Sequence, residues 1–445
     1  MITKTISASN KAAQTYRKVA IAACFGTFLE WYDFLTFATL AVTFGPLFFP
    51  SNDPASGLLA SLATFGVGMI VRPLGAAIFG SLGDRVGRRP VFMITITLMG
   101  IATVCVGFLP THSQIGIWAP ILLVSFRLMQ GLSAGGEIGG SAVYLTEHAG
   151  EKHRGFQTSF LQLMGPLGIL ASTLQIALLQ HWLSPEEFQS WGWRVPFWIS
   201  LGLLLLGFKA RMALEETPIF LQMEQSKGGS INPLRENFKD RATLKKMFLL
   251  FFCVSSGGSV LFFCTQIYTT IFLKTSTNLP AYLADKLSIY ATLSLIPLTI
   301  LAGWASDKIG RKPVVVAGLF LGAIFIMPAF HVLQTLSLEV ESASTVPYLC
   351  CILIGLSAIL AMVVGPQTAL LAELFPAKTR NSAATLPHNL AAGWIGGMLP
   401  LIITSLNQYW AGSLSGLWYP TIFLGIGAIV ATLFLPETVS TDLHF

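Results

Sequence analysis

The chain has 445 residues, of which 11% are charged and 53% are hydrophobic, and its formal net charge is +6. Soluble domains carry about 25% charged residues, so a soluble globule of this size could not bury so many apolar side chains. The composition excludes a disordered chain, a coiled-coil rod and an ordinary soluble enzyme, and it predicts a polytopic membrane protein.

Stretches of about 20 mostly apolar residues, long enough to cross a bilayer as helices, recur along the chain. In chain order they lie near residues 19–44, 57–82, 90–109, 117–146, 156–182, 193–211, 244–273, 281–305, 313–333, 345–373, 381–407 and 416–435. The polar, basic N-terminus lacks the features of a removable signal peptide, so we expect the first stretch to remain as a span. The sequence therefore predicts an all-α integral membrane protein with 12 transmembrane helices.

The basic residues gather in alternate loops. With the N-terminus placed inside, 22 of the 27 Lys and Arg residues lie in cytoplasmic segments. This asymmetry follows the positive-inside rule, so we expect both termini to be cytoplasmic. It also explains the basic net charge without nucleic acid, and no nucleic-acid partner is expected.

A hydrophilic segment rich in serine, glycine and charged residues separates the sixth predicted span from the seventh, and its composition is typical of a linker. We predict an N-terminal six-helix bundle over residues 1–211, a cytoplasmic linker over 212–243 and a C-terminal six-helix bundle over 244–445. No segment is long enough for a nucleotide-binding domain, and the phosphate-binding motif G-x-x-x-x-G-K-[ST] is absent from the sequence. ATP-driven transport by this chain alone is not expected.

The two halves repeat charged motifs in corresponding loops. Residues 80–90 read Gly-Ser-Leu-Gly-Asp-Arg-Val-Gly-Arg-Arg-Pro, and residues 303–313 read Gly-Trp-Ala-Ser-Asp-Lys-Ile-Gly-Arg-Lys-Pro. Glutamates and arginines also correspond after spans four and ten: Glu147, Arg154, Glu373 and Arg380. Because both halves have the same topology, the repeat is parallel, with an axis along the membrane normal.

The loop Gly80–Arg89 resembles in full the signature G-x-L-x-D-R-x-G-R-R of the major facilitator superfamily. Further motifs resemble the metabolite:proton symporter family within it, whose members carry proline, betaines, α-ketoglutarate, citrate, shikimate and related solutes. These motifs are Glu30–Phe34, Arg72–Gly75, Arg127–Glu137, Trp191–Phe197, Leu214–Pro218 and Glu373–Pro376. The resemblance covers essentially the whole chain, and it implies the superfamily fold and a place in a bacterial inner membrane.

Ionisable residues inside predicted spans indicate a functional site, because an unpaired charge there costs several kcal/mol. There are five clear cases: Glu30, Asp33, Arg72, Arg127 and Glu137. Counting about 1.5 Å per residue puts them at overlapping depths near the middle of the bilayer. We expect a polar cavity lined by spans one, two and four. The glycines of span four, among them Gly131 and Gly135, favour close helix packing there.

The acids Glu30, Asp33 and Glu137 are candidates for proton coupling, since substrate arrival or a change of accessible face can change the protonation of a buried carboxylate. Glu30 and Asp33 share one helix face, which favours one of them as the proton carrier. Arg72 and Arg127 are candidates for binding a substrate carboxylate. The alternative is a set of fixed ion pairs, Glu30 or Asp33 with Arg72, and Glu137 with Arg127.

Further candidates for substrate binding are Trp31, Tyr32 and Gln130. Aromatic residues of the first span, which include Phe34 and Phe37, could surround a quaternary ammonium group through cation–π contacts. In span eleven, His388 could reach the cavity, although a helix–helix hydrogen bond would explain it equally well.

The resemblance implies a charge latch at the cytoplasmic helix ends that stabilises the outward-facing state and must break as the halves move. Its six residues would be Asp84, Arg85, Arg88, Asp307, Lys308 and Arg311. We expect these residues to act in gating and not in substrate binding.

The predicted function is proton-coupled import of a small organic solute by alternating access. Residues 115–120 and 214–220 resemble osmolyte carriers and favour a zwitterion such as proline or glycine betaine. The alternatives are symport of a mono-, di- or tricarboxylate such as α-ketoglutarate, citrate or shikimate, and export. No enzyme, metal or organic cofactor is expected, because metal-ligand spacing and a nucleophile–base set are missing from the sequence. We expect a monomer whose partners are its substrate and the bilayer, with the proton as coupling ion.

Overall fold

The computed structural model describes residues 2–50, 54–226, 230–277, 279–338, 345–410, 412 and 414–443, and this part of the chain forms helices and loops with no strand. Eleven helical segments within it are long and apolar enough to cross a membrane. The predicted fourth span is α5 (Trp118–His148), which has 31 residues but is less apolar because it carries Arg127, Gln130 and Glu137. Together with α5, these segments match the twelve predicted spans.

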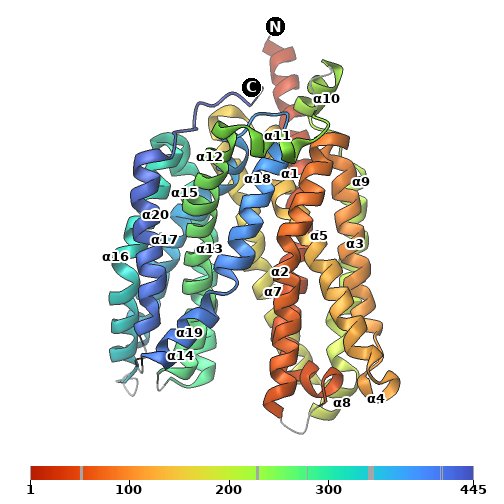
Figure 1. Cartoon of the computed structure of the whole chain (residues 1–445), viewed down its shortest axis with the longest axis vertical. Coiled ribbons are helices and arrows are strands. Elements are labelled where there is room, and N and C mark those ends of the chain that lie inside the picture. The colour runs from red at the N-terminus through yellow and green to blue at the C-terminus, as the bar shows by residue number, and fades with distance from the viewer. Residues whose placement is uncertain are drawn as a thin grey trace. The chain divides into compact units, whose positions relative to one another are not determined.

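Contacts divide the chain into two compact units, and unit 1 comprises Met1–His148, Leu167–Glu236 and Ala377–Leu386. Its long helices run alongside one another in Figure 1. They are α1 (Ile2–Phe48), α2 (Pro54–Val86), α3 (Arg88–Phe108), α5, α7 (Met164–Trp182) and α9 (Val195–Met212). Short helices lie in the connections: α4 (His112–Ile115), α8 (Pro185–Ser190), α10 (Pro218–Gln225) and α11 (Pro233–Lys239).

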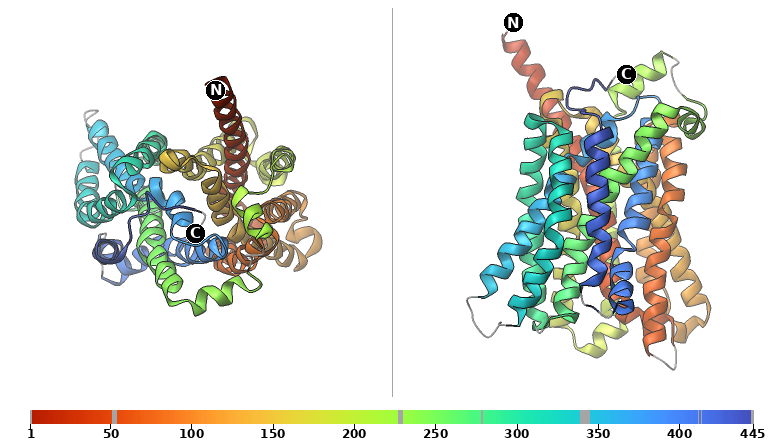
Figure 2. Two further views of the ribbon diagram at one scale, coloured as in Figure 1. Left: turned by 90° about the horizontal axis from the view of Figure 1, so that it is seen from above. Right: turned by 60° about the vertical axis from the view of Figure 1, so that its left-hand side comes forward.

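Unit 2 comprises Ala149–Pro166, Asn237–Pro376 and Pro387–Phe445. Its helices are α6 (Arg154–Ser159), α12 (Arg241–Leu249), α13 (Ser256–Phe262), α14 (Thr269–Thr275), α15 (Ala281–Ile309), α16 (Arg311–Ser337), α17 (Thr345–Glu373), α18 (Arg380–Leu390), α19 (Leu399–Tyr409) and α20 (Trp418–Phe434). The first residues of α18 belong to unit 1. Figure 2 shows α16 and α20 side by side within this unit.

Two spans of unit 2 are not regular α-helices. The seventh contains π-helical turns over residues 250–255 and 263–268, and the eleventh contains one over 391–396. Such turns interrupt the regular hydrogen-bond ladder and are frequent at functional positions. Apolar periodicity does not distinguish them from α-helix, so the sequence predicted continuous spans.

Each unit contains a short segment from the other half of the sequence. Residues 149–166, around the start of the fifth span, belong to unit 2, and residues 377–386, at the start of the eleventh, belong to unit 1. The boundary between the two units also falls inside the predicted linker, after Glu236. The compact units therefore differ from the predicted bundles over 1–211 and 244–445 at these places, and the linker at 212–243 stays a prediction.

Small residues let α2 and α5 approach closely. A Cβ atom on Gly75 would meet the backbone of Leu132, and one on Gly135 would meet the backbone of Arg72. A Cβ atom on Gly131 would likewise meet the backbone of Gly68. Glycines permit such close approach between membrane helices. The expected packing role of the span-four glycines is confirmed, and it brings Arg72 and Arg127 to the same side of unit 1.

An aromatic core fixes α1 against α9. The Phe44 ring lies 5.4 Å from that of Trp193 and 6.1 Å from that of Phe197, measured between centroids. All three side chains are buried. Aromatic pairs at such distances add to the stability gained from burial alone, so this core holds the first span in place.

We expect Gly75→Ala to lower the free energy of unfolding by about 1–3 kcal/mol, because the new Cβ overlaps backbone that cannot move aside cheaply. The matched control is Gly66→Ala on the same helix, where a Cβ atom meets nothing within 4 Å. There the better helix propensity of alanine should leave stability unchanged or raise it by up to about 1 kcal/mol. Thermal unfolding in detergent compares the two variants, and equal melting temperatures would contradict the close approach of α2 and α5.

Candidate functional site

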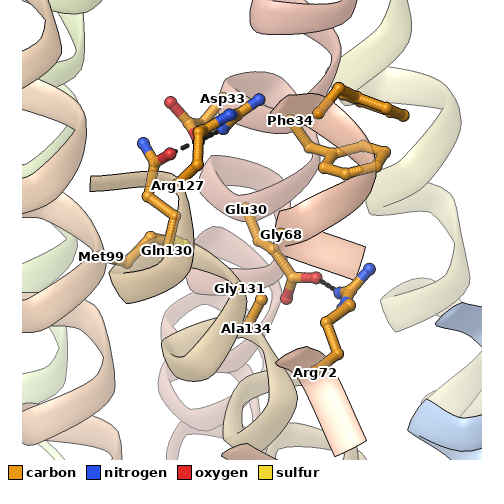
Figure 3. Close-up of a pocket in the computed structure, with 11 residues that line it drawn as sticks. Glu30, Asp33, Phe34, Gly68, Arg72, Met99, Arg127, Gln130, Gly131 and Ala134 are labelled. Carbon is orange, nitrogen blue, oxygen red and sulfur yellow. Dashed lines mark hydrogen bonds and ion pairs between the residues drawn. The ribbon is translucent and has the colours of Figure 1, made fainter. Parts of the chain in front are cut away.

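Unit 1 contains a small buried pocket between α1, α2 and α5 (Figure 3). Two acid–base pairs line it, Glu30 with Arg72 and Asp33 with Arg127. None of the four residues is more than 4% exposed. The polar cavity expected between spans one, two and four is therefore present in this unit, and Gln130 also lines it.

Helix geometry explains why these side chains meet. Glu30 and Asp33 are three residues apart on α1, so they lie on one face of that helix. The close approach of α2 and α5 places Arg72 and Arg127 beside this face. Each acid thus receives its own base, and Figure 3 shows the two pairs as separate contacts along α1.

The Asp33–Arg127 pair is held by one hydrogen bond. Arg127 Nη1 donates to Asp33 Oδ2 over 3.2 Å and to Gln130 Oε1 over 2.7 Å. The Arg127 guanidinium also lies 3.7 Å from the centroid of the Phe37 ring. Among the described residues, Asp33 Oδ1 and Arg127 Nη2 have no hydrogen-bond partner. Arg127 therefore has two interactions that do not depend on Asp33, and each member of the pair keeps an unused polar atom.

The Glu30–Arg72 pair has fewer alternatives. The two side chains form an ion pair, and Arg72 Nη1 otherwise approaches Met69 Sδ over 3.5 Å. The Arg72 guanidinium lies 6.0 Å from the Phe34 centroid. Glu30 Oε2 has no hydrogen-bond partner in the described part of the chain. Loss of the Glu30 charge would leave Arg72 without a neighbouring anion, which is costly for a buried cation.

The predicted binding residues Trp31 and Tyr32 do not line the pocket. They follow Glu30 by one and two positions, so the helix turns their side chains away from the Glu30 face. Tyr32 instead donates a hydrogen bond to the carbonyl oxygen of Pro196 on α9 over 3.0 Å. Their role in substrate binding stays a prediction.

An aromatic cage for a quaternary ammonium group is not formed by the first span. Phe37 is fully buried and packs against Arg127. Phe34 lines the pocket together with Phe65, and their ring centroids are 4.2 Å apart. Because these two rings contact each other, they do not enclose a space between them.

Glu137 lies outside the pocket and pairs with a residue that the sequence did not single out. Its carboxylate forms an ion pair with Arg211 of α9 and accepts a hydrogen bond from Thr95 Oγ1 over 3.0 Å. Arg211 also donates to the Phe92 carbonyl over 2.9 Å, and both members of the pair are no more than 1% exposed. The alternative pairing of Glu137 with Arg127 is wrong, because ten residues separate them by about 15 Å along α5.

The sequence contained only a weak signal for Arg211. It is next to the last residue of α9, in a basic segment that the sequence predicts to be cytoplasmic, where membrane topology alone would account for an arginine. Arg72 and Arg127 pair with the two acids of α1, so a buried Glu137 requires a third cation. That requirement was the available signal for Arg211.

A carboxylate caps a helix N-terminus in each unit. In unit 1, Asp84 accepts the backbone N–H groups of residues 381 and 382 over 3.0 and 2.9 Å, at the start of α18. In unit 2, Asp307 accepts those of residues 155 and 156 over 2.7 and 2.8 Å, at the start of α6. Free N–H groups and the helix dipole both stabilise an anion at such a position. The sequence predicted these acids in a charge network but not their capping role.

A glutamate between two arginines lies beside each capped helix. The contacts measure 3.1 to 3.3 Å in both units. The triads are Arg88–Glu147–Arg380 in unit 1 and Arg311–Glu373–Arg154 in unit 2. We call each cap with its triad a latch. The other two predicted gating residues, Arg85 and Lys308, are exposed, and Lys308 Nζ lies over the Trp304 ring at 4.1 Å.

We expect Glu137→Gln and Arg211→Gln each to lower the free energy of unfolding by about 3–5 kcal/mol, because either change leaves one buried charge unpaired. The double variant should recover part of this loss. Thermal unfolding in detergent measures all three. If Glu137→Gln left the melting temperature unchanged and removed proton-driven uptake, Glu137 would be a proton carrier and not a structural residue.

The sugar (and other) transporter family matches residues 19–230 and 222–444. The shikimate transporter of Escherichia coli K12 is 34% identical to this chain, and the match covers 94% of this chain and 93% of that protein. The glycine betaine/proline/ectoine/pipecolic acid transporter OusA of Dickeya dadantii is 31% identical over 96% of this chain and 84% of its own length. The inner membrane metabolite transport protein YhjE of Escherichia coli K12 is 34% identical, over 95% and 94%.

The solved structure of the major facilitator superfamily proton:xylose symporter XylE superimposes with a TM-score of 0.74, over 97% of this chain and 98% of XylE, at 19% identity. At that identity the likeness shows the fold alone. The family and its relatives are membrane transporters and not enzymes. This chain is therefore a multi-pass membrane transporter with the major facilitator fold, and it belongs to the sugar (and other) transporter family.

Proposed function

We propose that the chain is a proton-coupled symporter that imports a small, carboxylate-bearing organic solute by alternating access. Shikimate, proline and glycine betaine all carry a carboxylate, and the relatives that transport these solutes support this class. The class of carboxylate-bearing solutes includes the zwitterions that the sequence favours. It also includes the mono-, di- and tricarboxylates that are the alternative. We further propose a monomer in a bacterial inner membrane with both termini cytoplasmic.

The Asp33–Arg127–Gln130 cluster is the observation that carries this proposal. A proton carrier must gain and lose its charge without destabilising the site. When Asp33 is protonated, Arg127 keeps its hydrogen bond to Gln130 and its contact with Phe37. Arg72 has no comparable second support if Glu30 is protonated. We therefore assign the proton to Asp33 and a permanent ion pair to Glu30 and Arg72.

Protonation of Asp33 would also prepare the substrate site. Once Asp33 is neutral, Arg127 Nη1 and the unused Nη2 can both face an incoming carboxylate. Arginine suits this task, because its planar fork binds carboxylates bidentately and its charge does not titrate in proteins. Substrate and proton would then favour each other's binding, which is the coupling that symport requires.

The latches supply the gating part of the proposal. Each holds a segment from the opposite half of the sequence, residues 377–386 in unit 1 and residues 149–166 in unit 2. If the halves move during transport, these contacts must break and re-form. Asp84, Arg88, Asp307 and Arg311 are the predicted gating residues that belong to the latches.

We expect Asp33→Asn to abolish accumulation of solute driven by an inward proton gradient, because the asparagine cannot cycle between charged and neutral forms. Exchange of internal for external labelled solute without a gradient should persist. Uptake into proteoliposomes measures both reactions, with proline, glycine betaine, α-ketoglutarate, citrate and shikimate as test solutes. The control is Asp285→Asn, an acid that is 52% exposed in its side chain and pairs with Lys274.

Gradient-driven accumulation that survives in Asp33→Asn would contradict the assignment of the proton to Asp33. If no solute responded to the gradient in the unaltered protein, proton-coupled import itself would be wrong. Efflux from loaded vesicles under the reversed gradient would then test export.

We expect Asp84→Ala to raise the external solute concentration for half-maximal uptake by about two- to thirtyfold, because losing a helix cap costs about 0.5–2 kcal/mol and depopulates the latched state. Arg85→Gln is the matched control, since Arg85 is the next residue in the chain and is exposed. Initial rates at varied solute concentration separate the two variants. Identical curves for both would show that the cap does not contribute to gating.

A further inference from the structure

The pocket of unit 1 contains two carboxylates and two guanidinium groups, so it is electrically neutral when all four are ionised. We propose that this balance selects a hydroxylated monocarboxylate as the substrate and couples one such anion to one proton in an electroneutral cycle. The inference rests on the proposed function, because it takes Asp33 as the proton carrier and Arg127 as the carboxylate ligand.

The four loading states of the pocket differ in net charge. The empty pocket is neutral, whereas a pocket with Asp33 protonated and no substrate has one excess positive charge. A monocarboxylate alone leaves one excess negative charge, and proton and monocarboxylate together restore neutrality. An uncompensated charge inside the bilayer costs several kcal/mol. The empty and the fully loaded protein are therefore the two states that change their accessible face readily, which makes the coupling obligatory.

The proton path balances in this cycle. An Asp33 carboxylate oxygen takes a proton from water on one side, and the hydrogen bond from Arg127 Nη1 is released to the substrate carboxylate. After the change of face, the substrate leaves, and Asp33 gives its proton to water on the other side and pairs with Arg127 again. One proton and one anion cross together, and the four side chains return to their starting charges.

Other substrate charges do not satisfy this balance. With one proton bound, a zwitterion leaves one excess positive charge in the loaded pocket, and a dicarboxylate leaves one excess negative charge. Both would make the loaded state as costly as the half-loaded states. The first span also forms no aromatic cage, since Phe37 packs on Arg127 and Phe34 contacts Phe65. A quaternary ammonium group thus lacks charge compensation and an enclosing aromatic cage in this pocket.

The unused oxygen of Glu30 indicates the rest of the substrate. Glu30 Oε2 is buried and has no hydrogen-bond partner in the described chain, so it can accept a donor from a bound molecule. A buried acceptor left unpaired is costly, and an uncharged hydroxyl satisfies it without changing the charge balance. The pocket has only about 20 Å³ of accessible space in this structure, so a molecule with one carboxylate for Arg127 and a hydroxyl for Glu30 enters it when the surrounding helices move apart.

The other charged groups of the described chain do not alter this count. Glu137 and Arg211 compensate each other and are sealed from the pocket. In the described helices of unit 2, the Asp, Glu, Lys and Arg residues lie within about two turns of a helix end. His388 lies further inside, with its Nδ1 atom 3.2 Å from Gln367 Nε2 and 3.3 Å from Ser255 Oγ. Because it is a buried titratable group, His388 needs its own control variant.

The test separates the chemical gradient from the electrical one in proteoliposomes of the full chain. In one arm, equal potassium with valinomycin holds the membrane potential at zero while the interior is made alkaline. In the other arm, the pH is equal and a potassium gradient makes the interior negative. We expect shikimate, as the hydroxylated monocarboxylate probe, to accumulate in the first arm only. The ratio at equilibrium should be about tenfold per unit of pH difference, as one proton per anion requires.

Each outcome decides the proposal. Accumulation driven by the potential alone, or accumulation of proline or glycine betaine and not of shikimate, would overturn it while leaving proton-coupled import intact. If no test solute responded to either gradient, the proposed function would be wrong and this inference with it. His388→Gln is the control and should keep the same ratio for shikimate. Loss of gradient-driven accumulation in that variant, with accumulation retained in Asp33→Asn, would place the titrating group in unit 2 and overturn the assignment.

Discussion

The cost of a bare charge inside a membrane is the constraint on which the rest of this structure depends. Each of the five ionisable residues predicted within spans one, two and four belongs to an ion pair within unit 1. These pairs require α1, α2 and α5 to lie within side-chain reach of one another, and glycines at the α2–α5 contact make that approach sterically possible. Charge compensation in this unit therefore depends on glycine packing.

The same constraint acts at the helix ends, where it is met by backbone as well as by side chains. Asp84 and Asp307 compensate free N–H groups of α18 and α6 while lying next to an arginine. Because the motif is repeated at an offset of 223 residues, both units use one arrangement. A helix cap and an ion-pair triad are each strong only at short range, so a small displacement breaks them together. That property suits contacts that form in one state and not in another.

Sequence reasoning was sufficient wherever a local pattern determines the structure. Apolar length gave the spans, the repeated loop gave the parallel halves, and the spacing of Glu30 and Asp33 gave their shared helix face. It was insufficient where the structure depends on which residues, distant in the sequence, come together in space. Arg211 lies at the basic end of a predicted span by sequence but belongs to a buried ion pair by structure. The placement of Trp31 and Tyr32 outside the pocket follows from helix rotation, which a motif resemblance does not take into account. The exchange of residues 149–166 and 377–386 between units depends on long-range contacts that no local pattern encodes.

The three buried pairs differ in how much each would lose on protonation, and this difference separates structural pairs from functional ones. Glu137 and Arg211 share further bonds with Thr95 and the Phe92 carbonyl, so neutralising Glu137 disrupts a connected network. Glu30 is the single anion in contact with Arg72 among the described residues. Asp33 has one bond to an arginine that Gln130 and Phe37 also hold. A proton carrier must be paired closely enough for its charged form to be stable when buried. Its pairing must also be weak enough to break when the carboxylate is protonated. By these contacts, Asp33 is the acid that satisfies both requirements.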